Sequence, residues 1–137
     1  MATVQVRYIV HDVDAAVDFY TRLLGFTLVM RPAPPFAMLS RGDLRLVLSR
    51  PGGGRGGGSQ LLEGRMPEPG GWNRFAIEVE RLEETVEQLR AQGAHFRGEV
   101  ISGVGGKQAL LEDPSGNPIE LFEPMLPEAR LQHGGGG

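Results

Sequence analysis

The side chains that could do chemistry in this chain are a few charged residues on predicted strands, and Glu120 stands out among them. Alternation along a strand puts every second residue on a common face. Gln5 and Arg7 therefore share a face of one predicted strand, and Arg74 and Glu78 share a face of another. Glu120 is the obvious candidate for a general base, but a neighbouring arginine would stabilise its charged form and weaken it in that role.

The other residue types that enzymes commonly use are absent or poorly placed. The chain has no cysteine, so it has no thiolate nucleophile, no disulfide and no zinc site built on cysteine. His11 follows a predicted strand beside Asp12, His95 opens another strand, and His133 lies near the end. We expect capping or surface roles for them, and no Ser-His-Asp pattern or nucleophile elbow is present.

The first half of the chain predicts a strand, a helix and three further strands. Alternating residues favour a strand over 4–10, and Asp12 can cap a helix that stops near Gly25. The helix carries an apolar stripe, made of Val13, Val17, Tyr20 and Leu24. The three further strands are predicted over 26–31, 36–40 and 44–48.

The second half repeats this order. A shift that brings Tyr8 onto Ile77 also brings Val13 onto Leu82. The predicted elements are a strand over 73–79, a helix over 82–92, and strands over 95–101, 107–112 and 118–123. One such module cannot bury its own apolar face, so the repeat predicts two modules that pack together.

The organisation is that of one domain with a linker and a tail. We expect a single domain over 1–126, with module one over 3–50 and module two over 72–124. The glycine-rich segment 51–71 reads as a mobile flap, because it lacks the strand-loop-helix context of a phosphate-binding loop. Residues 127–137 are predicted to be a flexible tail.

Composition narrows the function classes. The 137 residues are 40% hydrophobic and 23% charged, which is ordinary for a globular domain. The formal net charge of −3 argues against a nucleic-acid partner. The sequence has no apolar run of about 18 residues, so we expect no membrane partner. It also lacks a signal-peptide pattern, and we expect a cytoplasmic protein.

Two segments carry a resemblance to a known family: HDVDAAVDFYTRLLGF near the start and LLEDPSGNPIELFEP near the end. With the repeat, they make residues 4–124 similar to the vicinal oxygen chelate superfamily, which includes glyoxalase I, extradiol dioxygenases, fosfomycin-modifying enzymes and bleomycin-binding resistance proteins. The resemblance implies an α+β fold in which two βαβββ modules form a curled eight-stranded mixed sheet around a cleft, with the helices outside.

In this family four inward side chains can hold a divalent metal. The resemblance places those positions at Gln5, Val47, Arg74 and Glu120. Valine and arginine offer no lone pair to a metal, and a cation beside the guanidinium would be repelled. We therefore expect the metal site to be lost, no cofactor to be needed, and Arg74 to pair with Glu120 across the cleft.

The cleft also predicts ligand contacts. Phe36, Met38, Trp72 and Phe122 could form an apolar and aromatic wall, although ordinary core positions are an equal alternative for Phe36 and Met38. The full set of predicted ligand-binding residues is Gln5, Arg7, Phe36, Met38, Arg45, Val47, Trp72, Arg74, Glu78, Glu120 and Phe122.

The resemblance and the altered metal positions favour a metal-independent binding protein that sequesters an apolar or aromatic small molecule, such as an antibiotic. One alternative is a metal-dependent lyase or dioxygenase that uses Gln5 and Glu120. Another is a metal-free isomerase or cyclase that works through Glu120 and Arg7. The resemblance also implies a homodimer.

Overall fold

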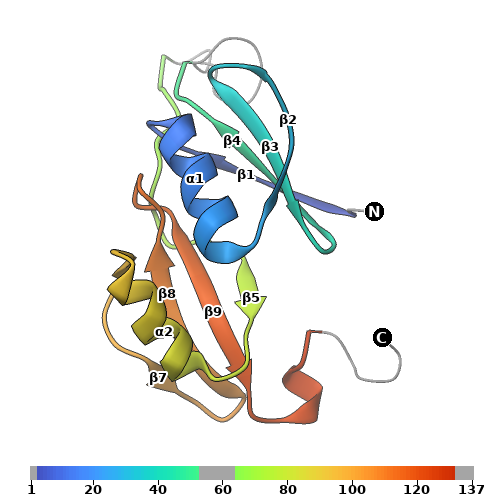
Figure 1. Cartoon of the computed structure of the whole chain (residues 1–137), viewed down its shortest axis with the longest axis vertical. Coiled ribbons are helices and arrows are strands. Elements are labelled where there is room, and N and C mark those ends of the chain that lie inside the picture. Colours follow the sequence, from blue (N-terminus) through green and yellow to red (C-terminus); the bar gives the residue numbers. More distant parts are fainter. Residues whose placement is uncertain (1–2, 53–63, 132–137) are drawn as a thin grey trace. The chain divides into compact units, whose positions relative to one another are not determined.

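The computed structural model describes residues 3–52 and 64–131 of the chain. These residues form two α-helices, nine strands and one 3-10 helix (Figure 1). They fall into two compact units: unit 1 comprises Met1–Trp72 with Asp113–Asn117, and unit 2 comprises Asn73–Glu112 with Pro118–Gly137. Each unit holds one helix and one mixed sheet, which confirms the predicted α+β class.

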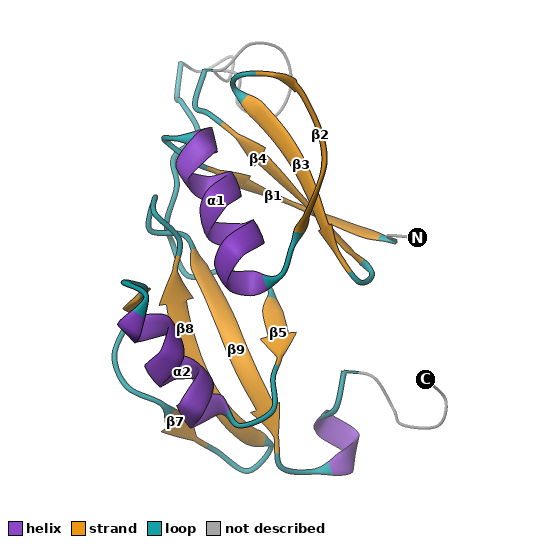
Figure 2. Ribbon diagram, in the orientation of Figure 1, coloured by secondary structure: helices purple, strands orange, loops and turns teal. Residues whose placement is uncertain are grey.

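Unit 1 is a four-stranded sheet with one helix on it. Its elements are β1 (Val4–Ile9), α1 (Val13–Leu24), β2 (Thr27–Ala33), β3 (Phe36–Arg41) and β4 (Leu44–Ser49). The strand order is β1-β4-β3-β2, with β1 parallel to β4 and the other neighbours antiparallel. Figure 2 shows α1 lying along this sheet.

The ends of α1 follow the predicted signals. The side chain of Asp12 accepts a hydrogen bond from the backbone N–H of Ala15 at 3.0 Å. Gly25 ends the helix in the left-handed conformation, with φ of 72°. The predicted apolar stripe was partly wrong, because Val17 is only half-buried. Phe19 is buried in its place, since the face that meets the sheet is rotated toward that side of the helix.

Unit 2 has the same order of elements with shorter strands. They are β5 (Ala76–Glu78), α2 (Leu82–Ala91), β6 (His95–Phe96), β7 (Ile101–Ser102), β8 (Gly106–Glu112), β9 (Pro118–Pro124) and the 3-10 helix η1 (Pro127–Ala129). The sheet order is β5-β9-β8-β6, with β7 paired to β8 and β5 parallel to β9.

Three predicted boundaries differ from the structure. The single strand expected over 95–101 is two short strands, β6 and β7, because Gly98 turns the chain at a φ of 84°. The strand expected over 73–79 is reduced to β5. The described part of the predicted tail contains η1, whereas residues 132–137 and linker residues 53–63 lie outside the described residues.

In each unit the helix covers one face of the sheet, and the strand residues on that face form the core. In unit 1 the buried strand residues on that face include Tyr8, Ala37, Leu39, Leu46 and Leu48. In unit 2 they include Ile77, Ala109, Leu111, Ile119 and Leu121. The opposite face of each sheet carries the predicted functional residues. Neither described helix is long and apolar enough to cross a membrane.

Candidate functional site

Six of the predicted ligand-binding residues share one face of the unit 1 sheet. The register pairs Gln5 with Arg45, Arg7 with Val47, and Val47 with Met38, so these residues lie on the same face. We call this surface the helix-free face of unit 1, because it is opposite the buried residues that pack on α1. The predicted residues on it are Gln5, Arg7, Phe36, Met38, Arg45 and Val47.

Burial differs across this face. Val47 and Ser49 are buried, whereas Phe36, Met38 and Arg45 are half-buried. Arg7 is exposed and donates a hydrogen bond from Nη1 to the hydroxyl of Ser49 at 3.0 Å. Ser49 was not among the predicted ligand contacts. Strand alternation from Arg45 and Val47 was the signal that could have added it.

Arg45 carries a buried hydrogen-bond donor without an acceptor on the described part of this face. Its Nε is buried and has no hydrogen-bond partner among the described residues. A buried N–H without an acceptor loses the hydrogen bond it would make to water, so it carries a free-energy cost. This atom would gain from an acceptor oxygen placed beside it.

Unit 2 contains the predicted pair of Arg74 and Glu120. Arg74 donates from Nε and from Nη2 to the same oxygen of Glu120, at 3.1 and 3.0 Å. Both side chains are well covered, with 27% of the arginine and 18% of the glutamate exposed. Charge-assisted hydrogen bonds of this kind are stronger than neutral ones.

The pair is confirmed, but its expected position across a cleft was wrong. Glu120 lies on β9 and is paired in register with Ala76 of β5. The backbone N–H of Glu120 also bonds to the carbonyl of Phe75, next to Arg74. The two charges therefore lie within one unit, because Arg74 precedes the edge strand β5 and Glu120 lies on β9, the parallel neighbour of β5.

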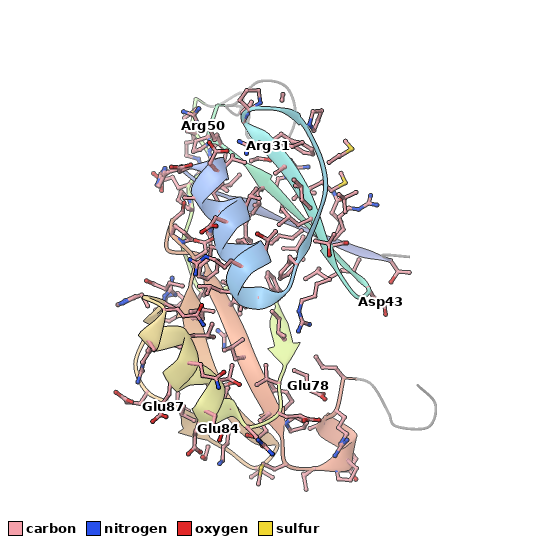
Figure 3. The ribbon with its side chains drawn as sticks, in the orientation of Figure 1. Arg31, Asp43, Arg50, Glu78, Glu84 and Glu87 are labelled. Carbon is pink, nitrogen blue, oxygen red and sulfur yellow. The ribbon has the colours of Figure 1, made fainter. Side chains whose placement is uncertain are left out.

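The remaining predicted residues are placed less specifically. Phe122 and Glu78 are half-buried and pair in register between β9 and β5. Glu78 accepts a hydrogen bond from the backbone N–H of Leu131 at 2.8 Å, which holds the segment after η1 (Figure 3). Trp72 lies before β5 with 68% of its surface exposed, and its place in an aromatic wall stays a prediction.

A divalent metal does not fit the residues at the four family positions. In unit 1, Gln5 offers one amide oxygen, and Val47 offers no lone pair. In unit 2, Glu120 already binds the guanidinium of Arg74 through one oxygen. The described residues contain no group of three or more His, Asp or Glu side chains that could hold a metal ion. A catalytic divalent site usually needs three protein ligands, and this donor set falls short.

A buried polar network that the sequence did not predict lies in unit 1. The hydroxyl of Tyr20 donates to Oδ2 of Asp113 at 2.8 Å, and Nδ2 of Asn117 donates to the same oxygen at 3.0 Å. Asn117 also donates to the carbonyl of Ile9 at 2.8 Å. Burial, and then the carboxylate of Asp113, raise the pKa of Tyr20 well above its usual value.

This network is structural. Oδ1 of Asp113 accepts hydrogen bonds from the backbone N–H groups of Ser115 and Asn117, so its own turn engages one oxygen of the carboxylate, while Tyr20 and Asn117 engage the other. The only sequence signal was the turn chemistry of residues 113–118, which says nothing of a partner as distant as Tyr20. The histidines do not join a site in the described structure: His11 is exposed, and His95 lies 3.4 Å from Glu112 with 74% of its side chain exposed.

Solved structures with the same fold include proteins whose names indicate different functions. A member of the glyoxalase/bleomycin resistance protein/dioxygenase superfamily from Sphaerobacter thermophilus DSM 20745 is 26% identical, with a TM-score of 0.69 over 90% of this chain and 98% of that one. The antibiotic binding protein TnmS3 from Streptomyces sp. CB03234 is 24% identical, with a TM-score of 0.64 over 90% and 97%.

A lactoylglutathione lyase from Agrobacterium tumefaciens is 20% identical, with a TM-score of 0.67 over 89% of this chain and 92% of that one. A search of curated protein sequences found no match. A protein-family model described as the Glyoxalase/Bleomycin resistance protein/Dioxygenase superfamily matches residues 3–121. That span covers most of both units and all the candidate residues except Phe122, and the chain therefore belongs to this superfamily.

Proposed function

We propose that this protein binds an apolar or aromatic small molecule without the help of a divalent metal. The observation that carries the proposal is the pair of Arg74 and Glu120. The guanidinium donates two hydrogen bonds to the carboxylate at the positions where the family would bind metal. Arg74 thereby supplies a fixed positive charge in place of an ion, and it cannot donate a lone pair.

The same pair argues against turnover. Glu120 is the obvious general base, and one of its carboxylate oxygens already accepts two hydrogen bonds from Arg74, so that oxygen is engaged by the guanidinium. Asp113 is engaged by Tyr20 and by its own turn. Sequestration of a ligand needs no such group, so binding without reaction is the function that these residues support best.

The ligand class follows from the apolar side chains on the sheet faces that lie opposite the helices. Phe36 and Met38 in unit 1, and Phe122 in unit 2, are half-buried apolar residues that no helix covers. Half-buried aromatic and thioether groups suit a flat or apolar ligand. TnmS3 shows that this fold occurs in an antibiotic binding protein, and an antibiotic is accordingly a ligand to test first.

We also propose that the protein forms a homodimer. Three consecutive apolar side chains of the edge strand β2 are exposed, namely Leu28, Val29 and Met30 at 44%, 48% and 46%. Contiguous apolar groups on a sheet edge favour association. A second copy of the chain is the partner that the family resemblance suggests.

The binding test compares affinity with and without metal. Chelator-treated protein is screened against aromatic natural products, including antibiotics, and hits are measured by calorimetry in EDTA and then in Zn²⁺ or Mn²⁺. We expect equal affinities in the two conditions and recovery of unchanged ligand by mass spectrometry. Phe122→Ala should weaken binding, while Val104→Ala, at a loop residue that is 89% exposed, should not. Binding that requires metal, or conversion of the ligand to a product, would contradict the proposal.

A further inference from the structure

The helix-free face of unit 1 has an unusual balance of charge. Two arginines project from it: Arg7 on β1, in the row that contains Val47, and Arg45 on β4, in the neighbouring row that contains Gln5. The remaining side chains that the register places on this face are polar or apolar: Gln5, Ile9, Thr27, Met30, Ala33, Phe36, Met38, Ser40, Val47 and Ser49. None of these described strand residues is acidic.

Among the described residues, the two arginines have no carboxylate partner, whereas several other arginines do. Arg22 and Arg31 in unit 1 form ion pairs with Asp18 and Asp14. Neither Arg7 nor Arg45 forms an ion pair with any residue that the structure describes. Arg7 is held by a neutral hydroxyl, that of Ser49, so its charge is positioned without being neutralised.

Arg45 also has a hydrogen-bond donor without an acceptor in the described structure. Its Nε is buried and has no acceptor in the described structure, although the side chain as a whole is half-buried. A guanidinium presents its N–H groups in a fixed planar fork that matches two oxygens of an oxyanion. The missing partner is therefore best supplied by an acceptor that carries negative charge.

We propose that the helix-free face of unit 1 selects ligands in which an oxyanion, such as a carboxylate or sulfonate, is attached to an apolar or aromatic framework. Arg45 binds the oxyanion and Arg7 adds to the local positive potential. Phe36 and Met38 contact the framework. This inference rests on the proposed binding function and narrows its ligand class from apolar molecules to anionic ones.

Two fluorescent probes that differ in one group test the selection directly. They are 8-anilinonaphthalene-1-sulfonate, which is anionic, and N-phenyl-1-naphthylamine, which has the same rings without the sulfonate. Titrations of both are made with the wild-type protein, with Arg45→Met, which keeps a long apolar side chain, and with Arg45→Lys. The control variant is Arg22→Met on the exposed side of α1. Circular dichroism shows whether each variant is folded.

We expect Arg45→Met to weaken sulfonate binding by about tenfold or more, because a charge-assisted hydrogen bond is lost. Binding of the neutral probe should change by less than about twofold, which is small on the scale that separates related ligands. Arg45→Lys should retain part of the sulfonate affinity, and added salt should weaken only the anionic probe.

The outcomes separate the inference from the function on which it rests. If both probes bind and Arg45→Met affects them equally, anion selection is overturned and the binding function stands. If neither probe binds to the wild-type protein, this face is not the apolar site, and both proposals lose their support there. A sulfonate-specific loss that Arg22→Met reproduces would reflect net charge alone and would also overturn the inference.

Discussion

At the scale of single residues, the proposed function rests on one ion pair. The family resemblance places Arg74 and Glu120 at metal-binding positions, and the two side chains bond to each other at 3.0 and 3.1 Å. The sequence predicted this pair, because a carboxylate on a partly buried strand needs a cation. It did not predict that the pair joins two neighbouring segments of one unit, since the parallel register of β5 and β9 depends on residues far apart in the chain.

Replacing Arg74 by Leu should destabilise unit 2, because Glu120 would lose two charge-assisted hydrogen bonds while only 18% of its side chain is exposed. We expect a loss of about 1–2 kcal/mol in the free energy of unfolding, measured with urea. The matched control is Arg22→Leu, which removes an exposed ion pair on α1 and should cost about 0.5 kcal/mol or less. Equal losses in the two variants would mean that the Arg74 pair contributes no more than a surface contact.

At the scale of elements, the turn Asp113–Asn117 has the most surprising role. It connects β8 and β9 of unit 2 but belongs to unit 1, where Asn117 bonds to the carbonyl of Ile9. The sequence favours a turn here, because turn-forming residue types gather at 113–118, and Gly116 has a positive φ of 86°. It could not predict the contacts with Tyr20 and Ile9, because those partners are 93 and 108 residues away in the chain.

Tyr20 should make stability fall in alkali. Its pKa in the folded protein is raised above 10, mainly by burial and then by Asp113, so the folded state keeps a proton that an unfolded tyrosine releases near pH 10. This contribution is complete below about pH 10 and is lost as the pH rises beyond it. Urea unfolding of Tyr20→Phe should show a loss of about 1–2 kcal/mol near neutral pH and a flatter decline above about pH 10. Parallel declines in the variant and the wild-type protein would contradict this.

Gly106 is a second element-scale constraint, at the start of β8. A Cβ atom there would lie 2.2 Å from the carbonyl oxygen of Glu123 on β9, and backbone atoms cannot move away cheaply. Gly106→Ala should cost about 1–3 kcal/mol in thermal or urea unfolding. Gly105→Ala is the control, since a Cβ atom at that position meets nothing within 4 Å. If the two variants are equally stable, β8 and β9 are less closely packed at this point than described.

At the scale of the whole molecule, the sequence predicted the repeat better than the details of either half. Tyr8 and Ile77, which occupy equivalent positions in the repeat, are both buried under the helix of their own unit. Strand alternation also put Arg7, Arg45 and Val47 on one face correctly. The missing acceptor of Arg45 could not be predicted, because it depends on what every neighbouring side chain does in three dimensions.

The proposed homodimer makes a prediction at this scale. Val29→Glu places a charge in the exposed apolar run of β2 and should convert a dimer to a monomer, because a buried unpaired charge is costly. Light scattering with size-exclusion chromatography should give twice the chain mass for the wild-type protein and for the control Val104→Glu. A monomeric wild-type protein, or a Val29→Glu variant that stays dimeric, would show that β2 is not the interface.

The most direct test of the account is the metal content of the purified protein. The protein is incubated with Zn²⁺, Ni²⁺ or Mn²⁺, dialysed, and measured by mass spectrometry of the elements beside a Glu120→Gln variant. Because Val47 and Arg74 cannot act as ligands, we predict much less than one ion per chain and no difference between the two proteins. About one ion per chain in the wild-type protein, lost in Glu120→Gln, would contradict the metal-independent account.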